Sequence, residues 1–261
     1  MLTVFTSADT KYEPFVLPYI ASVLLHNKET HVEIVLEDAA AFRKKYAKAI
    51  KVLEKYFTAA TFTLRDGDFS KAGSHAIRFL ETPSKLSEFV YIGDIDILIL
   101  QAITPAHLKH MNATGLNYSN IIRKEDPPRL TGLHFTRYDA YYPLADVEMP
   151  EGPGWDEVLL TKQVQAKGNE LQLSDQWSRP LHGFHISLRR LPFGSPNWGL
   201  EPHFIGAYKN FTSHGVWVDL YPLLDPRYHR VSALLDTALI GRFPDEMAGW
   251  EGPTKKSISL W

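Results

Sequence analysis

The sequence predicts an α/β fold, with a mixed, mostly parallel central sheet flanked by helices in a Rossmann-like arrangement. The first observation is that short apolar segments alternate with segments of helical period along about the first 100 residues, a pattern typical of βαβ units. The second is the segment FVYIGDIDILIL at residues 89–100. Its β-branched and aromatic residues indicate a strand buried on both faces, as in parallel sheets.

Each element of the first half has its own signal. Phe15, Tyr19 and Val23 recur at helical spacing, and Phe42 and Leu53 belong to the apolar stripe of a lysine-rich segment whose basic residues form a solvated face. The strands are short apolar segments bounded by polar residues. In chain order we expect a strand at residues 2–6, a polar loop at 6–9, a helix at 15–25, a strand at 31–36, a helix at 39–57, a strand at 60–64, a helix at 75–81 and the strand at 89–100.

The second half carries weaker signals. Thr104 and Pro105 are typical of a helix start, and Asp156 is suited to cap the helix that follows it. The expected elements are a helix at residues 106–111, a strand leading into an aromatic turn at 130–142, a helix at 156–166, a strand at 171–173 that ends in Ser174 and Asp175, and a helix at 229–240. Because no clean linker divides the chain, we expect a main domain at residues 1–200 and an aromatic-rich extension at 201–261 that packs on it.

Composition narrows the classes of function. A chain of 261 residues with 44% hydrophobic and 22% charged residues is typical of a globular protein with a sizeable core. The formal net charge of −2 gives no reason to expect a nucleic-acid partner. The absence of cysteine excludes disulfides and thiolate metal sites. Because neither a signal peptide nor a transmembrane-length apolar segment is visible, we expect a cytoplasmic protein, for which peripheral membrane contact stays open.

Asp94 and Asp96 interrupt the apolar segment at residues 89–100. Two ionised carboxylates in apolar surroundings repel each other and lose hydration, so one would be driven toward protonation unless a cation lies nearby. Along an extended strand, alternate residues project to the same side, so both carboxylates can reach one divalent metal ion while Ile95 packs behind them. The alternative is that the two acids lie in a turn at a strand end and accept hydrogen bonds from backbone amides.

The order of these features resembles the nucleotide-sugar glycosyltransferases of the GT-A fold and, among them, glycosyltransferase family 8. The family has an A-D-x-x-Y-like loop after its first strand, an arginine about 16 residues before its metal motif, and a metal strand that reads Y-L-D-x-D-V-L. The matching residues of this chain are Ala8, Asp9, Thr10, Lys11 and Tyr12 in the loop, Arg78 before the motif, and Tyr91, Ile92, Gly93, Asp94, Ile95, Asp96, Ile97 and Leu98 in the strand, with Gly93 as an extra residue.

The resemblance implies a metal-dependent glycosyltransferase with its nucleotide-sugar-binding and catalytic domain at residues 1–200. It would transfer a hexose from a UDP-sugar to a hydroxyl of a saccharide or lipid-linked saccharide, in glycan or surface-polysaccharide synthesis, and would retain the anomeric configuration. In the donor site, Tyr12 would stack on the base, Asp9 would accept a hydrogen bond from the base or ribose, and the backbone of Thr6, Ser7 and Ala8 would contact the base edge.

The resemblance also implies a metal and sugar site. Asp94 and Asp96 would hold Mn²⁺ or Mg²⁺, which would neutralise the diphosphate of the leaving group. Arg78 offers a rigid fork of donors to a carboxylate or to donor oxygens, with Glu81 or Glu88 as alternative partners. Asp156 corresponds to the acid that contacts the transferred sugar in family 8.

A late histidine supplies the third metal ligand in family 8. Between His182 and His185 we select His185. An imidazole beside carboxylates favours Mn²⁺ over Mg²⁺. The family pattern around this histidine survives only as fragments, at His185, Gly194 and Trp198, and Arg189 and Arg190 are further candidates to contact the diphosphate.

Other interpretations of the same residues stay open. Trp155, Tyr141 and Tyr142 either form a sugar-stacking acceptor wall or pack in the core. A sugar-nucleotide nucleotidyltransferase would use a related sheet, but such enzymes generally carry a glycine-rich loop near the N-terminus, and residues 6–12 contain no glycine. A non-catalytic carbohydrate-binding protein on the same fold is the remaining alternative.

Overall fold

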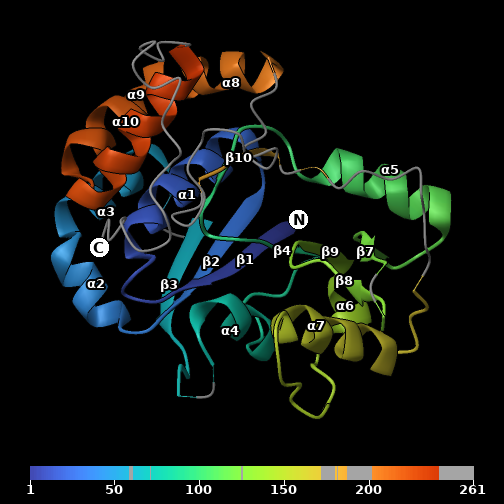
Figure 1. Cartoon of the computed structure of the whole chain (residues 1–261). Coiled ribbons are helices and arrows are strands. Elements are labelled where there is room, and N and C mark those ends of the chain that lie inside the picture. Colours follow the sequence, from blue (N-terminus) through green and yellow to red (C-terminus); the bar gives the residue numbers. More distant parts are fainter. Residues whose placement is uncertain are drawn as a thin grey trace, which may run out of the picture.

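The computed structural model describes residues 1–58, 61–70, 72–124, 126–171, 180, 182–186 and 202–240. The largest sheet has six strands in the order β3-β2-β1-β4-β9-β6 (Figure 1). These strands are β1 Leu2–Ala8, β2 Thr30–Leu36, β3 Phe62–Asp66, β4 Phe89–Ile92, β6 Tyr118–Ser119 and β9 His134–Arg137. Strands β1 to β4 run parallel, whereas β9 is antiparallel to both of its neighbours. The predicted α/β class with a mixed, mostly parallel sheet is confirmed.

Two antiparallel pairs and a set of helices surround this sheet. Strand β5 (Ile97–Ile99) pairs with β10 (Gly183–His185), and β7 (Ile122–Arg123) pairs with β8 (Arg129–Leu130). The helices are α1 Glu13–His26, α2 Ala39–Lys45, α3 Ala47–Tyr56, α4 Ser74–Leu80, α5 Thr104–Thr114, α6 Tyr138–Tyr141, α7 Trp155–Ala166, α8 Pro202–Ser213, α9 Gly215–Leu220, η3 Tyr221–Leu223 and α10 Pro226–Ile240.

Side chains that alternate along the strands build a hydrophobic cluster on each face of the sheet. Val4 belongs to one cluster, which includes residues of α1, α3 and α8 to α10. Its neighbour Phe5 belongs to the other, which includes residues of α4, α6 and α7. This period of two is the expected property of a strand with both faces covered.

The strand order reverses between β1 and β4. The chain proceeds from β1 to β2 and β3 on one side and then returns to place β4 on the other side of β1. In open α/β sheets, ligands bind at the carboxyl ends of the strands at such a point. The residues that follow β1 and β4 are those around Asp9 and Asp94, so the topology brings the two motifs of the sequence to one edge.

The predicted single strand at residues 89–100 is wrong. Strand β4 ends at Ile92, the chain turns between Gly93 and Asp96, and β5 begins at Ile97 in another sheet. The carbonyl of Gly93 accepts hydrogen bonds from two side chains, Thr6 Oγ1 at 2.8 Å and Arg78 Nη1 at 2.9 Å. Asp94 and Asp96 therefore lie in a turn, as the alternative interpretation held, and not side by side along a strand.

Two helix predictions also need correction. The segment at residues 39–57 forms two helices, which meet at Tyr46 (φ −105°, ψ 21°). The hydroxyl of Tyr46 donates to Asp225 Oδ2 at 2.8 Å, so this junction is fixed by a residue far along the chain. Asp156 does not cap α7, because the N-cap is Gly154 in the left-handed region (φ 70°) and Asp156 is already the second helical residue.

Other elements also differ from expectation or lie partly outside the described residues. Strand β1 continues to Ala8, so residues 6–8 belong to the strand and not to a loop. The predicted strand at residues 130–142 is divided among β8, β9 and the short helix α6. Of the predicted strand at 171–173, only Leu171 is described, and Ser174 and Asp175 lie outside the described residues.

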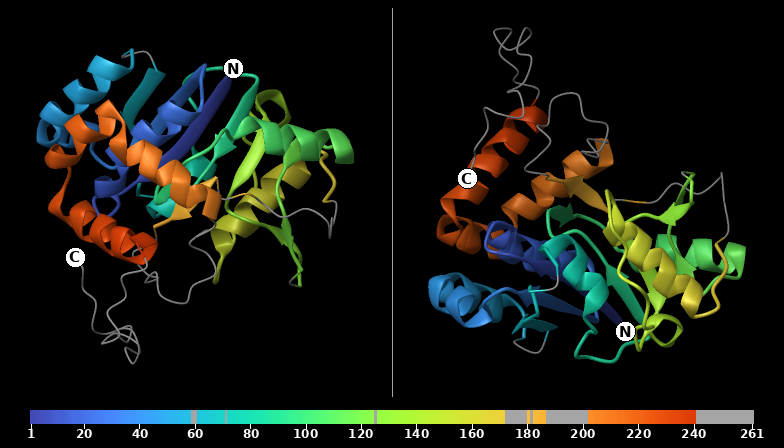
Figure 2. Two further views of the ribbon diagram at one scale, coloured as in Figure 1. Left: turned by 90° about the horizontal axis from the view of Figure 1, so that it is seen from above. Right: turned by 60° about the horizontal axis from the view of Figure 1, so that its bottom comes forward.

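The C-terminal helices pack on the main domain. Figures 1 and 2 show α9 and α10 beside α1 and α3, although these pairs are far apart in the sequence. The rings of Tyr228 and Phe15 are 5.8 Å apart and meet edge to face. A domain boundary at residue 200 lies outside the described residues and stays a prediction. No helix in the described part of the chain combines the length and hydrophobicity needed to cross a bilayer.

Candidate functional site

A cleft of about 580 Å³ opens at the carboxyl ends of β1 and β4. It collects residues from the end of β1, the start and middle of α4, the turn after β4, the start of α7, and β10. Most of the site residues predicted from the sequence line it, namely Ser7, Asp9, Tyr12, Arg78, Asp94, Asp96, Asp156 and His185. Residues more than 170 positions apart in the chain thus face one cavity.

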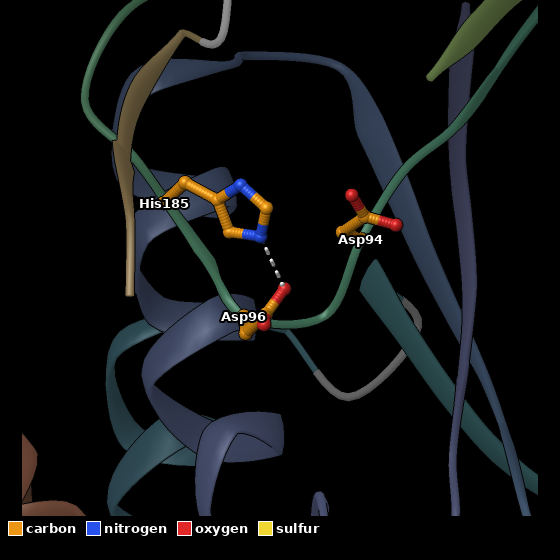
Figure 3. A group of neighbouring side chains, drawn as sticks. All are labelled: Asp94, Asp96 and His185. Carbon is orange, nitrogen blue, oxygen red and sulfur yellow. Dashed lines mark ion pairs between the residues drawn. The ribbon is translucent and has the colours of Figure 1, made fainter. Parts of the chain in front are cut away.

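Asp94, Asp96 and His185 converge inside this cleft (Figure 3). One ligand atom from each of the three residues lies within 4.8 Å of the others. His185 Nε2 is 3.2 Å from Asp96 Oδ1. Two carboxylates and an imidazole at this spacing could hold a divalent metal ion.

Strand β10 places His185 beside Asp96. His185 pairs with Ile97 in the ladder with β5, and the backbone amide of Ile186 donates to the carbonyl of Asp96 at 2.7 Å. The strand can approach this closely because residue 183 is glycine: a Cβ there would lie 1.9 Å from the carbonyl oxygen of Leu98. The short ladder therefore fixes His185 next to the turn that carries the two acids.

Arg78 is a buried cation at the edge of the cluster. Its side chain donates to the carbonyl of Gly93 at 2.9 Å and forms an ion pair with Asp94. Burial by itself lowers the pKa of Arg78, but the carboxylates of Asp94, Asp156 and Asp96 raise it overall, so the guanidinium stays charged. The expected alternative partners, Glu81 and Glu88, are not those that Arg78 contacts.

The cleft has an excess of negative charge. Among the described residues that line it, four are aspartates, at positions 9, 94, 96 and 156, and two, Lys11 and Arg78, carry a permanent positive charge. With neutral histidines, these described residues carry an excess of two negative charges. A diphosphate would be repelled by such a surface unless a cation accompanied it.

Comparisons with known proteins give little further information. No family model matches the sequence, and no curated protein matches it. Among solved structures, the chain is similar to the apo form of the glycosyltransferase GlyE from Streptococcus pneumoniae TIGR4, with 12% sequence identity and a TM-score of 0.34. This similarity covers 53% of the chain and 33% of the GlyE chain. At this TM-score it carries no argument about fold or function, so the GT-A and family 8 assignments stay predictions.

The loop after β1 is organised by Asp9. Its Oδ1 accepts from the backbone amide of Tyr12 at 3.0 Å, and its Oδ2 accepts from Ser74 Oγ at 2.9 Å. Ser7 Oγ in turn donates to the carbonyl of Ser74 at 2.5 Å. Asp9 thus joins the loop to the start of α4. Tyr12, which is half-buried, itself occupies the N-cap position of α1.

Other predicted residues do not reach the cleft. Thr6 and Ala8 are fully buried, and Thr6 uses its hydroxyl to support Gly93. Tyr141 and Tyr142 are buried in the core beneath α7, so the packing interpretation holds for both. Trp155 does line the cleft, where its ring meets that of His75 edge to face at 5.5 Å.

His182 and His185 have different surroundings. His182 is fully buried, and its Nε2 lies 2.9 Å from Nε2 of His107, in the interior. His185 alone of the two lines the cleft. The further candidates Arg189 and Arg190, and the fragments Gly194 and Trp198, lie outside the described residues.

Ser74 and His75 also line the cleft, although the sequence did not single them out. They begin α4, the helix that carries Arg78. His75 and Arg78 are three residues apart and therefore lie on one face of the helix. This spacing is the signal that could have identified His75.

Proposed function

We propose that this chain is a metal-dependent glycosyltransferase that transfers a hexose from a UDP-sugar to a hydroxyl of a saccharide or lipid-linked saccharide, with retention of the anomeric configuration. The observation that carries the proposal is the convergence of Asp94, Asp96 and His185 in a negatively charged cleft at the carboxyl ends of β1 and β4. Nucleotides are commonly bound at this position of an open α/β sheet.

The residues present fit a divalent cation. Two carboxylates and one imidazole are a suitable donor set, and the mixture of oxygen and nitrogen suits Mn²⁺ better than Mg²⁺. The excess of two negative charges in the cleft is the charge that one such ion would balance. When bound, the ion would act as a Lewis acid that stabilises the departing diphosphate.

The protein's own side chains would bind and orient the two substrates. Tyr12, which is half-buried at the N-terminus of α1, would offer a face of its ring to the base. Asp9 accepts a hydrogen bond from the backbone amide of Tyr12 and so keeps the loop between β1 and α1 in place. Arg78 holds Asp94 in position through its ion pair. Asp156 lies at the start of α7, where its carboxylate would accept hydrogen bonds from sugar hydroxyls, and Trp155 would cover an apolar sugar face.

The test is release of UDP from a panel of UDP-sugars in the presence of Mn²⁺. We expect Asp96→Ala to abolish metal-dependent turnover and to leave the thermal transition nearly unchanged, because the Asp96 carboxylate pairs with His185, which itself lines the cleft. Asp139→Ala, which removes an exposed carboxylate on α6, is the matched control and should keep full activity. Unchanged turnover in Asp96→Ala would refute the assignment.

Two further assays separate the alternatives. Release of pyrophosphate from a nucleoside triphosphate and a sugar phosphate would identify a nucleotidyltransferase. Glycan binding that is insensitive to a chelator, without release of UDP, would identify a carbohydrate-binding protein.

A further inference from the structure

Below the turn that carries the two acids lies the hydroxyl group of Tyr19. Tyr19 belongs to α1 and is 1% exposed. Among the described residues, its hydroxyl oxygen has no hydrogen-bond partner. This oxygen lies 3.0 Å from the point that a Cβ on Gly93 would occupy, so it contacts the start of the turn directly.

A buried hydroxyl without a partner does not stabilise the form of the protein in which it is found, because its lost hydration is not replaced. The hydroxyl stays protonated and is therefore able to donate a hydrogen bond. Burial, and after it the charges of Tyr91, Asp94 and Asp96, raises the pKa of Tyr19 well above its ordinary value. Tyr19 is therefore a hydrogen-bond donor at neutral pH that lies against Gly93 and lines one small pocket together with Asp96.

The carboxylates of the turn take their donors from elsewhere in this structure. Asp94 is paired with Arg78, and Asp96 Oδ1 lies 3.2 Å from His185 Nε2. That nitrogen cannot both donate a proton to Asp96 and offer its lone pair to a cation. A metal ion bound between the three residues would therefore leave Asp96 without a hydrogen bond from His185.

We propose that Tyr19 is a positioning residue of the metal-loaded site, whose hydroxyl donates a hydrogen bond to an oxygen atom of the turn at residues 93–96. This inference rests on the proposed metal site. Carboxylates that bind metals are commonly fixed by such outer hydrogen bonds, and loss of one typically lowers metal affinity by about 10- to 100-fold.

The substitution that tests this is Tyr19→Phe, which removes the hydroxyl and keeps the ring. Tyr141→Phe is the matched control, because Tyr141 is also 1% exposed and its hydroxyl also lacks a partner among the described residues, but it lies in the other hydrophobic cluster. The readouts are the Kd for Mn²⁺ by calorimetric titration of the intact chain and the Tm of the metal-free protein.

We expect Tyr19→Phe to raise the Kd for Mn²⁺ by about tenfold with a metal-free Tm equal to or above that of the wild type. Tyr141→Phe should leave the Kd unchanged. An unchanged Kd in Tyr19→Phe overturns the inference, and so does a metal-free Tm that falls further than in Tyr141→Phe, since the hydroxyl would then have a structural partner. If the wild type fails to bind Mn²⁺, or if Asp96→Ala binds it equally well, the metal site itself is refuted along with the role of Tyr19.

Discussion

Gly93 directly follows the last residue of β4, and its replacement by alanine tests how the turn at residues 93–96 packs against the core. A Cβ on Gly93 would lie 2.7 Å from Cε1 of Tyr91 and 3.0 Å from the hydroxyl of Tyr19. Both rings are buried, at 0% and 1% exposure. Neither contact atom is the free end of a flexible exposed side chain, so the turn itself has to shift.

These two contacts determine how far Gly93→Ala should lower the free energy of unfolding. Insertion of a methyl group into a well-packed interior typically costs about 1–3 kcal/mol. In a protein of this size, each kcal/mol lowers Tm by roughly 2–4 °C, so Gly93→Ala should lower Tm by several degrees. Because Asp94 follows directly and the carbonyl of Gly93 is held by Thr6 and Arg78, the same shift should weaken Mn²⁺ binding.

Thermal unfolding and Mn²⁺ titration of Gly93→Ala should be compared with those of Gly206→Ala. Gly206 lies in the interior of α8, is exposed, and has open space where a Cβ would be added. Alanine there should stabilise the protein by up to about 1 kcal/mol, because glycine is the poorer helix former. If Gly93→Ala matched the wild type in both Tm and Mn²⁺ affinity, the turn would not be packed against the two tyrosines as described.

Two further predictions concern acid stability. Burial lowers the pKa of His134 to about 3, below its ordinary value of about 6.5. The unfolded chain therefore binds the proton more strongly, and the free energy of unfolding falls by about 1.4 kcal/mol for each pH unit below pH 6.5. His134→Phe should flatten the dependence of Tm on pH between pH 6.5 and pH 4, and an unchanged slope would contradict the buried neutral state. Burial would raise the pKa of Asp225, but hydrogen bonds from Arg227 and Tyr46 hold it well below its ordinary value. Asp225→Asn should therefore lower the free energy of unfolding at pH 7, and the difference from the wild type should shrink progressively as the pH falls below about 4. Urea titrations at pH 7 and at several values below pH 4 would show this.

The sequence predicted those features of the fold and of the site that depend on neighbouring residues in the chain. Apolar periodicity placed β1, β2 and α1 correctly because a buried face repeats along each element whatever lies opposite it. The acids at Asp94 and Asp96 were recognisable because carboxylates among apolar residues are costly. Their convergence with Arg78 at one sheet edge followed from the order of strands and helices, which the sequence also indicates.

Long-range contacts explain what the sequence did not show. The end of β4 depends on the acceptance of side-chain hydrogen bonds by the Gly93 carbonyl, from Thr6 and Arg78. The break between α2 and α3 coincides with a hydrogen bond from Tyr46 to Asp225, 179 residues away. Contacts with residues so distant in the sequence do not change the local pattern of apolar residues. The sequence therefore predicted a single strand at residues 89–100 and a single helix at residues 39–57.

The choice between the two late histidines shows the same limit. His182 and His185 are equally plausible ligands by residue type, and only the ladder between β10 and β5 brings one of them to the turn. The roles of His185, Asp156 and the donor-site residues stay predictions until metal and donor binding are measured.

Strand β10 adds the last candidate ligand after all the strands of the main sheet. These six strands lie within residues 2–137, whereas β10, which carries His185, begins at Gly183. A chain that ended before Gly183 would contain every strand of that sheet and both aspartates, but it would lack His185 and also the helices α8 to α10 that cover one face of the sheet. The third candidate metal ligand is thus carried by a three-residue strand that forms no part of the main sheet.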